Sequence, residues 1–394
     1  MCRPALLAIA VALLFGAPGS VAPAQGSEAL LVLRLHQIPD HGPDYTLLSV
    51  DPLTLAQRGS SLALGEQSIL GWAYSADRSQ LALGGSSVRI VDLASMRVAR
   101  ELGTGDGGTP TVLAWPAPNR VLGVEYTPDL KFVVLDPSGG KVVRKRRLRG
   151  EELDVARAGT NVVFVLAPLN RVGATRLVVG APDGSVRSVT LRQIVGGRHF
   201  ARGDVGRIRD PGLAIDQAAG RAYVVGAPGP VAEVDLRTLA VMYHYLLGAA
   251  KNITGEARQA LWLGNGLVAV AGSHFGESHI GTPTGLKLLD TRTWRTTTLD
   301  PDGAWFLRSR STLLTVKGQE NSDLTTYSLD GRRLVDARFD QPFGSLDAIG
   351  GYVYTWNVDS KTMRVIDLST GSVVASPTAE DYLELIGDRD SIDR

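Results

Sequence analysis

The stretch that decides the fold is Thr362-Met-Arg-Val-Ile-Asp-Leu-Ser-Thr-Gly-Ser-Val-Val374. It reads as a strand that ends at Asp367, a turn, and a second strand, a sequence typical of antiparallel sheets. We expect the Asp367 carboxylate to accept backbone N–H groups two residues on. We also expect Gly371 to adopt the positive φ that such a turn favours.

This phrase recurs along the whole chain. An apolar strand followed by Asp and turn-forming residues ends at Asp51, Asp92, Asp136, Asp183, Asp235, Asp290, Asp330 and Asp367. The intervals run from 37 residues (Asp330 to Asp367) to 55 (Asp235 to Asp290). A four-stranded propeller blade needs roughly 40–50 residues. The sequence therefore predicts an all-β propeller of four-stranded antiparallel blades, and these Asp residues are interpreted as turn formers.

The expected number of blades follows from where the four-strand units begin. Complete units start near residues 68, 111, 152, 211, 259, 304 and 344, whereas 29–64 holds three strands and lacks the innermost one. The alternating segment Tyr382 to Ile386 can supply that strand beside Leu30 to Leu35 and remove two exposed edges. Eight blades are favoured on this basis, and seven blades with a loose N-terminal hairpin is the alternative.

A family resemblance rests on the same residues. The segment 362–374 resembles the repeat of the YVTN-type propellers, in which a Val-x-Val-Ile-Asp strand, a Thr-Gly turn and a Val-Val strand recur. Arg221 to Val225, with Val231 to Val241, resembles it too. The resemblance implies an exported propeller in a WD40-like, quinoprotein-like superfamily that includes lactonases and many binding proteins. It assigns no catalytic residue to this chain.

Composition limits the partners that the chain can have. Of 394 residues 44% are hydrophobic, and the formal net charge is +1. A neutral chain has no electrostatic footprint for nucleic acid. The only cysteine is Cys2, so no disulfide is expected.

The N-terminus has the pattern of a secretory signal peptide over residues 1–24. Arg3 precedes the apolar run Ala5 to Phe15, and Ala22-Pro-Ala24 offers small residues for cleavage. An uncleaved anchor is the alternative. We therefore expect residues 25–394 to form a single propeller domain of a secreted, extracytoplasmic bacterial protein, monomeric and without stable membrane insertion.

The candidate site residues lie in polar insertions between the predicted strands. In a propeller, the loops between second and third strands share one face with the loops that join blades. That face is predicted to carry His36, Asp40, His41, His199, His274, Glu277 and His279. Three interpretations remain open, namely a ligand-binding rim, a metal site with Asp40 or Glu277 as oxygen ligands, and solvated loops.

Two further features are interpreted as structural. Trp72, Trp115, Trp262 and Trp305 fall in predicted first strands, where large rings fill the space between blades. The basic run Lys141 to Arg149 falls on an outermost strand, where charge prevents pairing with other chains. An anionic partner is the alternative for this run.

The predicted function is a module that binds a small molecule or a protein through the loop-rich face. No nucleophile elbow, phosphate loop, zinc motif or dinucleotide fingerprint occurs in a fitting context, so no cofactor and no catalytic residue are predicted. Whether the chain is an enzyme is left open. The alternative function is a metal-dependent propeller hydrolase of the lactonase type.

Overall fold

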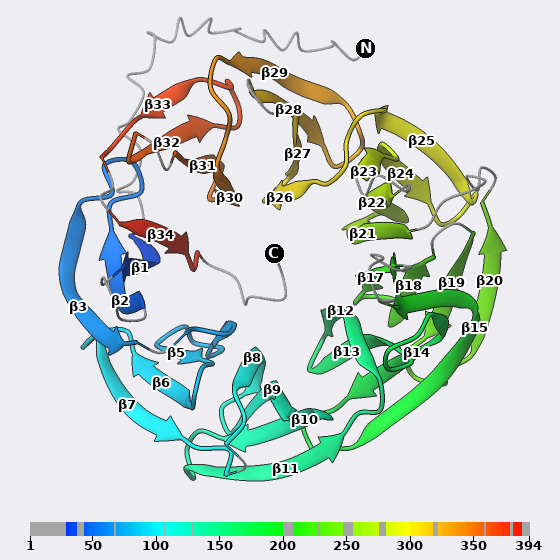
Figure 1. The fold of residues 1–394 in the computed structure, drawn as a ribbon, viewed down its shortest axis with the longest axis horizontal. Coiled ribbons are helices and arrows are strands. Elements are labelled where there is room, and N and C mark those ends of the chain that lie inside the picture. Colours follow the sequence, from blue (N-terminus) through cyan, green and yellow to red (C-terminus); the bar gives the residue numbers. More distant parts are fainter. Residues whose placement is uncertain are drawn as a thin grey trace, which may run out of the picture.

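The computed structural model describes residues 29–37, 43–66, 68–105, 107–127, 129–199, 208–226, 229–246, 255–275, 281–317, 322–357, 360–378 and 381–387. The predicted signal peptide lies outside these ranges. Within them every regular element is a β-strand, as the repeat predicts, and there is no helix that could span a membrane. The strands form a ring in which each sheet runs from the centre to the periphery (Figure 1).

Six sheets have four strands each, and in each sheet the first strand named lies nearest the centre of the ring. The first three sheets are β34 (Tyr382–Leu385), β1 (Leu30–Gln37), β2 (Pro43–Val50) and β3 (Gln57–Gly65); β4 (Trp72–Tyr74), β5 (Gln80–Leu83), β6 (Val88–Asp92) and β7 (Arg97–Leu102); and β8 (Pro110–Ala117), β9 (Arg120–Thr127), β10 (Asp129–Asp136) and β11 (Lys141–Arg147). The other three are β17 (Gly212–Asp216), β18 (Arg221–Val225), β19 (Pro230–Asp235) and β20 (Val241–Tyr245); β26 (Leu307–Ser309), β27 (Thr312–Lys317), β28 (Ser322–Ser328) and β29 (Arg333–Phe339); and β30 (Ser345–Ile349), β31 (Tyr352–Asn357), β32 (Thr362–Asp367) and β33 (Val373–Ala375).

The seventh sheet has ten strands. It contains β12 (Glu151–Ala158), β13 (Asn161–Ala167), β14 (Gly173–Gly180), β15 (Val186–Arg198), β16 (Ile208–Asp210), β21 (Gly255–Gly264), β22 (Leu267–Phe275), β24 (Leu286–Asp290) and β25 (Arg295–Asp300), with β23 (Gly281–Pro283) paired to β22.

The predicted ring of eight, or alternatively seven, separate four-stranded blades is therefore wrong. The structure has six four-stranded blades, and the remaining strands belong to the ten-stranded sheet. The physical reason is β16, which lies in an insertion that the sequence suggested was a loop. It pairs antiparallel with β15 and parallel with β21, and so joins strands on either side of blade β17–β20 into one sheet.

The prediction that the C-terminal segment completes the first blade is confirmed. Strand β34 pairs antiparallel with β1, with Val32 opposite Leu385 and Leu35 opposite Tyr382. We call this pairing the seam. Leu383 and Leu385 are buried against Tyr354 and Met363 of the preceding blade, so β34 contacts both the first blade and the last.

The recurring Asp residues are turn formers, as predicted. The Asp51 carboxylate accepts the N–H of Leu53 at 2.9 Å and of Thr54 at 2.8 Å, and these hydrogen bonds lower its pKa to about 2. The residue four positions after the Asp takes a positive φ in most repeats, namely Leu55, Met96, Gly140, Leu239, Trp294 and Gly371. The expectation for Gly371 thus extends to positions where the sequence has no glycine.

The tryptophans and the basic run also lie largely where predicted. Trp72 and Trp115 are buried in the inner strands β4 and β8, where they pack, whereas Trp305 precedes β26 and is half-exposed. Lys141 to Arg147 form β11, the outer edge of its blade.

Candidate functional site

The structure describes three of the seven candidate residues. Asp40, His41, Glu277 and His279 lie outside the described ranges. His36 is an exposed residue of β1, and its Nδ1 lies 2.8 Å from Oδ1 of Asp381. His274 lies on β22, and in Figure 1 strands β1 and β22 stand on opposite sides of the ring.

His199 and His274 belong to the same part of the molecule. His199 is exposed and directly follows β15, whose last residue is Arg198. Arg198 is opposite Ile208 of β16, and the next residue of β16, Arg209, is paired with Glu256 of β21. Glu256 is in turn opposite His274. The structure therefore brings together the surroundings of two predicted histidines and leaves His36 across the ring.

Ionisable side chains gather where β15, β16, β21 and β22 meet beside β12. We call this place the junction. Its members are Glu151, Glu152 and Asp154 of β12, Arg198 of β15, Arg209 and Asp210 of β16, Glu256 and Arg258 of β21, His274 of β22 and Lys287 of β24.

Two glycines allow the chain to approach the junction so closely. Gly150 has a φ of +129° and precedes β12; a Cβ there would lie 2.3 Å from the Ala167 carbonyl oxygen. Gly197 of β15 has a φ of +117°, and its Cβ would lie 2.3 Å from the carbonyl oxygen of Arg171. An L side chain fits neither the space nor the backbone angle. The end of β15 therefore turns toward β16 because residue 197 is glycine.

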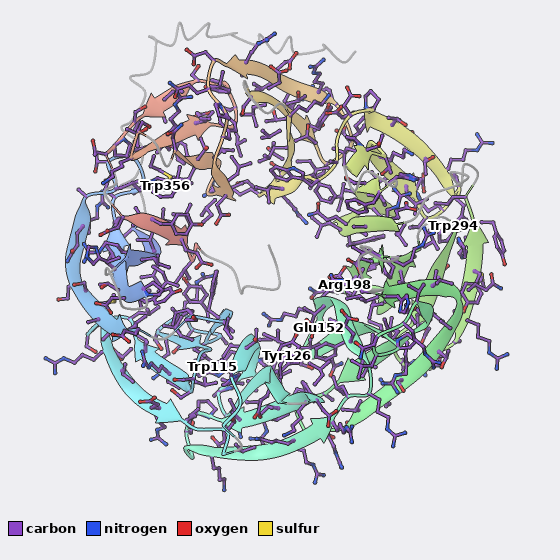
Figure 2. The ribbon with its side chains drawn as sticks, in the orientation of Figure 1. Trp115, Tyr126, Glu152, Arg198, Trp294 and Trp356 are labelled. Atoms are coloured by element: carbon purple, nitrogen blue, oxygen red, sulfur yellow. The ribbon has the colours of Figure 1, made fainter. Side chains whose placement is uncertain are left out.

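One end of the junction is acidic. Arg198 lies between two carboxylates, with Nη2 3.0 Å from Oδ2 of Asp210 and Nε 3.9 Å from Oε1 of Glu151. Burial raises the pKa of the neighbouring Glu152, against a hydrogen bond with Tyr126 that lowers it. Figure 2 shows Tyr126, Glu152 and Arg198 next to one another at the inner edge of the ring.

Asp154 lies deeper in the acidic end. Its Oδ2 accepts the N–H of Leu213 at 2.7 Å, which links β12 to the first strand of blade β17–β20. Its Oδ1 accepts the N–H of Val155 at 2.8 Å. Burial raises the pKa of Asp154 to about 7, although these two hydrogen bonds oppose the rise. The group is thus a carboxyl that changes charge near neutral pH.

The other end of the junction is basic and surrounds a single carboxylate. Glu256 is fully buried, with 0% of its side chain exposed, and forms a close ion pair with Arg258. Arg209 Nη1 lies 3.8 Å from Oε2 of Glu256, and His274 Nε2 lies 3.9 Å from Oε1. The charge of Lys287 also acts on Glu256.

The pKa shifts show that the cations of the basic end repel one another. Burial lowers the pKa of Lys287, and the charge of Arg258 lowers it further. Burial also lowers the pKa of His274, and the charges of Arg258, Lys287 and Arg209 lower it further. Burial raises the pKa of Glu256, which the three cations oppose. The basic end thus places three cations around one carboxylate.

Several buried polar atoms of the junction have no hydrogen-bond partner among the described residues. They are Oε2 of Glu152, Oδ1 of Asp210, Nε of Arg258 and Nδ1 of His274. Buried polar atoms in folded proteins are nearly always hydrogen-bonded, to protein or to another molecule. The junction therefore has unused donors and acceptors in addition to the cations of its basic end.

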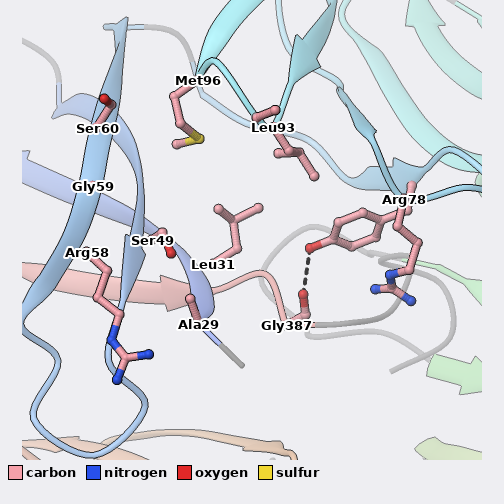
Figure 3. Close-up of a pocket in the computed structure, with 12 residues that line it drawn as sticks. Ala29, Leu31, Ser49, Arg58, Gly59, Ser60, Arg78, Leu93, Met96 and Gly387 are labelled. Carbon is pink, nitrogen blue, oxygen red and sulfur yellow. Dashed lines mark hydrogen bonds between the residues drawn. The ribbon is translucent and has the colours of Figure 1, made fainter. Parts of the chain in front are cut away.

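A hollow of about 730 Å³ lies at the seam, on the other side of the ring from β21 (Figures 1 and 3). Tyr74 donates a hydrogen bond of 2.6 Å to the Gly387 carbonyl oxygen in its wall, drawn as a dashed line in Figure 3. Its two arginines are engaged, since Arg58 pairs with Asp51 and Arg78 lies over the Tyr74 ring. This hollow has no buried cluster of ionisable groups among its described residues, so the junction is the stronger candidate site.

No group of three or more His, Cys, Asp or Glu side chains in the described part of the chain is arranged to hold a metal ion. Four of the residues predicted for a metal or ligand rim lie outside that part. The hydrolase alternative stays an untested prediction.

Sequence reasoning missed most of the junction. Only His274 of its ten members was among the predicted site residues. A usable signal was present, because Glu256-Ala-Arg258 and Glu151-Glu-Leu-Asp154 place charges in inner strands, whereas the inner strands β4 and β8 contain no charged residue. Buried charges are rare unless they are paired or functional.

The comparisons with known proteins support the fold. No protein-family model and no curated protein match the chain. One similar solved structure is the dihydro-heme d1 dehydrogenase NirN in complex with DHE, with a TM-score of 0.58 and 14% sequence identity. The match covers 94% of this chain and 77% of the NirN chain. The computationally designed Ika8 protein is similar with a TM-score of 0.51 and 14% sequence identity. The match covers 86% of this chain and 97% of the Ika8 chain. BamB from Moraxella catarrhalis has a TM-score of 0.39 and 10% sequence identity. This match covers 88% of this chain and 87% of the BamB chain. The similarity to NirN supports a β-propeller repeat fold, and no match confirms the YVTN family.

Proposed function

We propose that this chain is an exported binding propeller that holds a small anionic ligand at the basic end of the junction. The observation that carries the proposal is that Arg209, Arg258 and Lys287, all partly buried, lie around the single buried carboxylate of Glu256. A propeller fold supports a binding or scaffold role, but propellers host many unrelated activities, so the function must come from the site.

An anion is the ligand that this charge arrangement favours. A buried charge is costly unless another charge or hydrogen bonds compensate it. Arg258 and Arg209 carry guanidinium groups, which bind carboxylates and phosphates through paired N–H donors. Lys287 adds a third cation, and at the acidic end Arg198 lies between the carboxylates of Glu151 and Asp210. A carboxylate or phosphate group placed among these cations would relieve their repulsion.

The experiment is a thermal-shift and calorimetric titration with malonate and inorganic phosphate, at constant ionic strength set with chloride. Uncharged sugars serve as probes of matched size. Glu256→Gln removes the competing negative charge and should tighten anion binding by about tenfold, whereas Lys287→Gln should weaken it by a similar factor. The two variants thus change affinity in opposite directions, which a purely structural role does not predict.

The matched control is another buried ion pair, outside the Glu256 cluster. Glu125 of β9 is fully buried and lies 2.9 Å from Nζ of Lys145. Glu125→Gln should leave anion affinity within about twofold of wild type. The proposal fails if neither anion stabilises the wild type beyond chloride, or if Glu256→Gln and Lys287→Gln shift affinity in the same direction.

Export rests on the sequence alone, on the signal-peptide pattern over residues 1–24. The test is expression of the full chain in a bacterium, cell fractionation and N-terminal sequencing. We expect a mature protein that begins near residue 25 outside the cytoplasm. Intact chain confined to the cytoplasm would contradict export without affecting ligand binding.

A further inference from the structure

We propose that a second surface, a groove on the outer side of the junction, binds an acidic segment of a partner protein. The groove has a volume of about 520 Å³ and lies between the end of β11 and the turn that connects β13 to β14. Its lining includes Asp129, Arg147, Arg149, Leu148, Leu169 and Arg171. The groove adjoins the junction at Gly150, but none of its lining residues belongs to the Glu256 cluster.

The groove carries positive charge that no carboxylate of the described residues neutralises. Arg147 pairs with Asp129 at 2.8 Å. Arg149 and Arg171 are exposed, and neither guanidinium pairs with a carboxylate of any residue that the structure describes. With Asp129 counted, the three arginines leave two positive charges facing solvent.

Its apolar parts favour a protein partner over a small ion. Leu130 and Leu148 are buried beneath the groove, whereas Leu169 at its rim is 65% exposed. An exposed Leu beside arginines is the composition of a protein interface, in which Arg anchors and apolar contacts occur together. Arg149 and Arg171 would bind carboxylates, and Leu169 would contact an apolar side chain of the same segment.

The size of the basic surface argues against a nucleic acid. Nucleic-acid sites present a basic stripe that follows a phosphate backbone. Here the arginines of the groove lie at one end of the short basic strand β11, in a chain of formal net charge +1. A short acidic segment matches this footprint. The basic run Lys141 to Arg149 then has two separate roles, since its C-terminal end belongs to the groove and the rest protects a strand edge.

The test is fluorescence anisotropy with a labelled peptide of alternating Glu and Leu, with a Lys and Leu peptide as the charge-reversed probe. The wild type should bind the acidic peptide only, and more weakly as salt rises. The double variant Arg149→Glu and Arg171→Glu should lower affinity by at least about tenfold. Both residues are exposed, so the variant should fold, which circular dichroism and the melting temperature would verify.

The matched control lies on the same basic strand but outside the groove. Arg146 is exposed on β11 and does not line it. Arg146→Glu should leave affinity within about twofold of wild type. Equal weakening by Arg146→Glu would show non-specific attraction and overturn the inference. So would absence of peptide binding by the wild type, or binding of pyrophosphate or a DNA oligonucleotide at this groove in place of the peptide.

Discussion

Two places in the ring join strands that are far apart in the sequence, and they differ in chemistry. At the seam, β34 pairs with β1, and its two leucines, Leu383 and Leu385, are buried in an apolar cluster. At the junction, β16 and β21 form only two residue pairs, and one of these is the charged pair Arg209 and Glu256. The seam has the composition of a stabilising contact, whereas the junction has that of a binding site.

This difference suggests a division of roles between the two regions. Apolar burial stabilises a fold without needing a partner. Buried charge stabilises it only where geometry and hydrogen bonds are complete, and at the junction they are incomplete among the residues that the structure describes. The following predictions test whether stability depends mainly on the seam and ligand binding on the junction.

The largest effect is expected from loss of the seam strand. Truncation after residue 380 removes Leu383, Leu385 and Ile386, whose side chains are 9%, 2% and 1% exposed. Their burial contributes about 5 kcal/mol to the free energy of unfolding, so urea denaturation should show at least that loss. A chain that ends at residue 387 retains the strand and should unfold at the wild-type urea concentration. Equal stability of the two truncations would show that the seam is dispensable.

A smaller effect, local to the junction, is expected from Gly197→Ala. The new Cβ meets the Arg171 carbonyl oxygen, and the backbone angle suits only glycine, so we expect a loss of about 3 kcal/mol together with weaker anion binding. The matched variant in the seam blade is Gly65→Ala, where φ is +76° but no atom lies within 4 Å. It should lose about 1 kcal/mol and bind anions normally. Equal losses of affinity would break the comparison.

A third prediction separates the two regions by pH. The pKa of Asp154 is about 7 in the folded protein, against an ordinary value of 3.8, so the folded state holds this proton more firmly. Its contribution to stability is therefore present below about pH 4 and is lost as the pH rises to about 7, at up to about 1.4 kcal/mol per pH unit. The stability of Asp154→Asn relative to wild type should therefore increase as the pH rises from about 4 to about 7. Above about pH 7 the difference should stay constant. Leu385→Ala should differ from wild type by a constant amount at every pH, and a flat profile for Asp154→Asn would contradict the assignment.

The smallest effect should be the same in both regions, because the Asp turn belongs to the common scaffold. Hydrogen bonds lower the pKa of Asp51, in the seam blade, and of Asp290, beside the junction, to about 2 in each case, against partial burial that raises it. Their contribution is present above about pH 4 and is lost as the pH falls toward 2. Asp51→Asn and Asp290→Asn should each lower the melting temperature by a few degrees at pH 6 and by almost nothing near pH 2. Unequal effects would show that one Asp has a further role.

The sequence predicted the features that depend on local chemistry. The Asp phrase located third strands and their turns, because each turn is built from its own residues. The alternation of Tyr382 to Ile386 was enough to pair that strand with β1. The basic run was correctly placed on an outer strand, since its charges have a local reason.

The features that depend on long-range pairing could not be predicted. Strand β16 has three residues, Ile208 to Asp210, and neither its length nor its pattern indicates a parallel partner as distant in the sequence as β21. Because β16 was missed, the fusion into a ten-stranded sheet was missed, and so was the meeting of Arg209 with Glu256. The histidines were visible in the sequence, but the arginines that surround His274 come from separate segments that only the fold brings together.

The most direct test of the central claim, that the junction and not the seam is where a ligand binds, is hydrogen exchange with and without inorganic phosphate at constant ionic strength. The account predicts slower exchange in peptides that cover 208–210 and 255–275, and unchanged exchange in peptides that cover 30–37 and 382–385. Protection at the seam alone, or no protection at the junction at saturating phosphate, would contradict it.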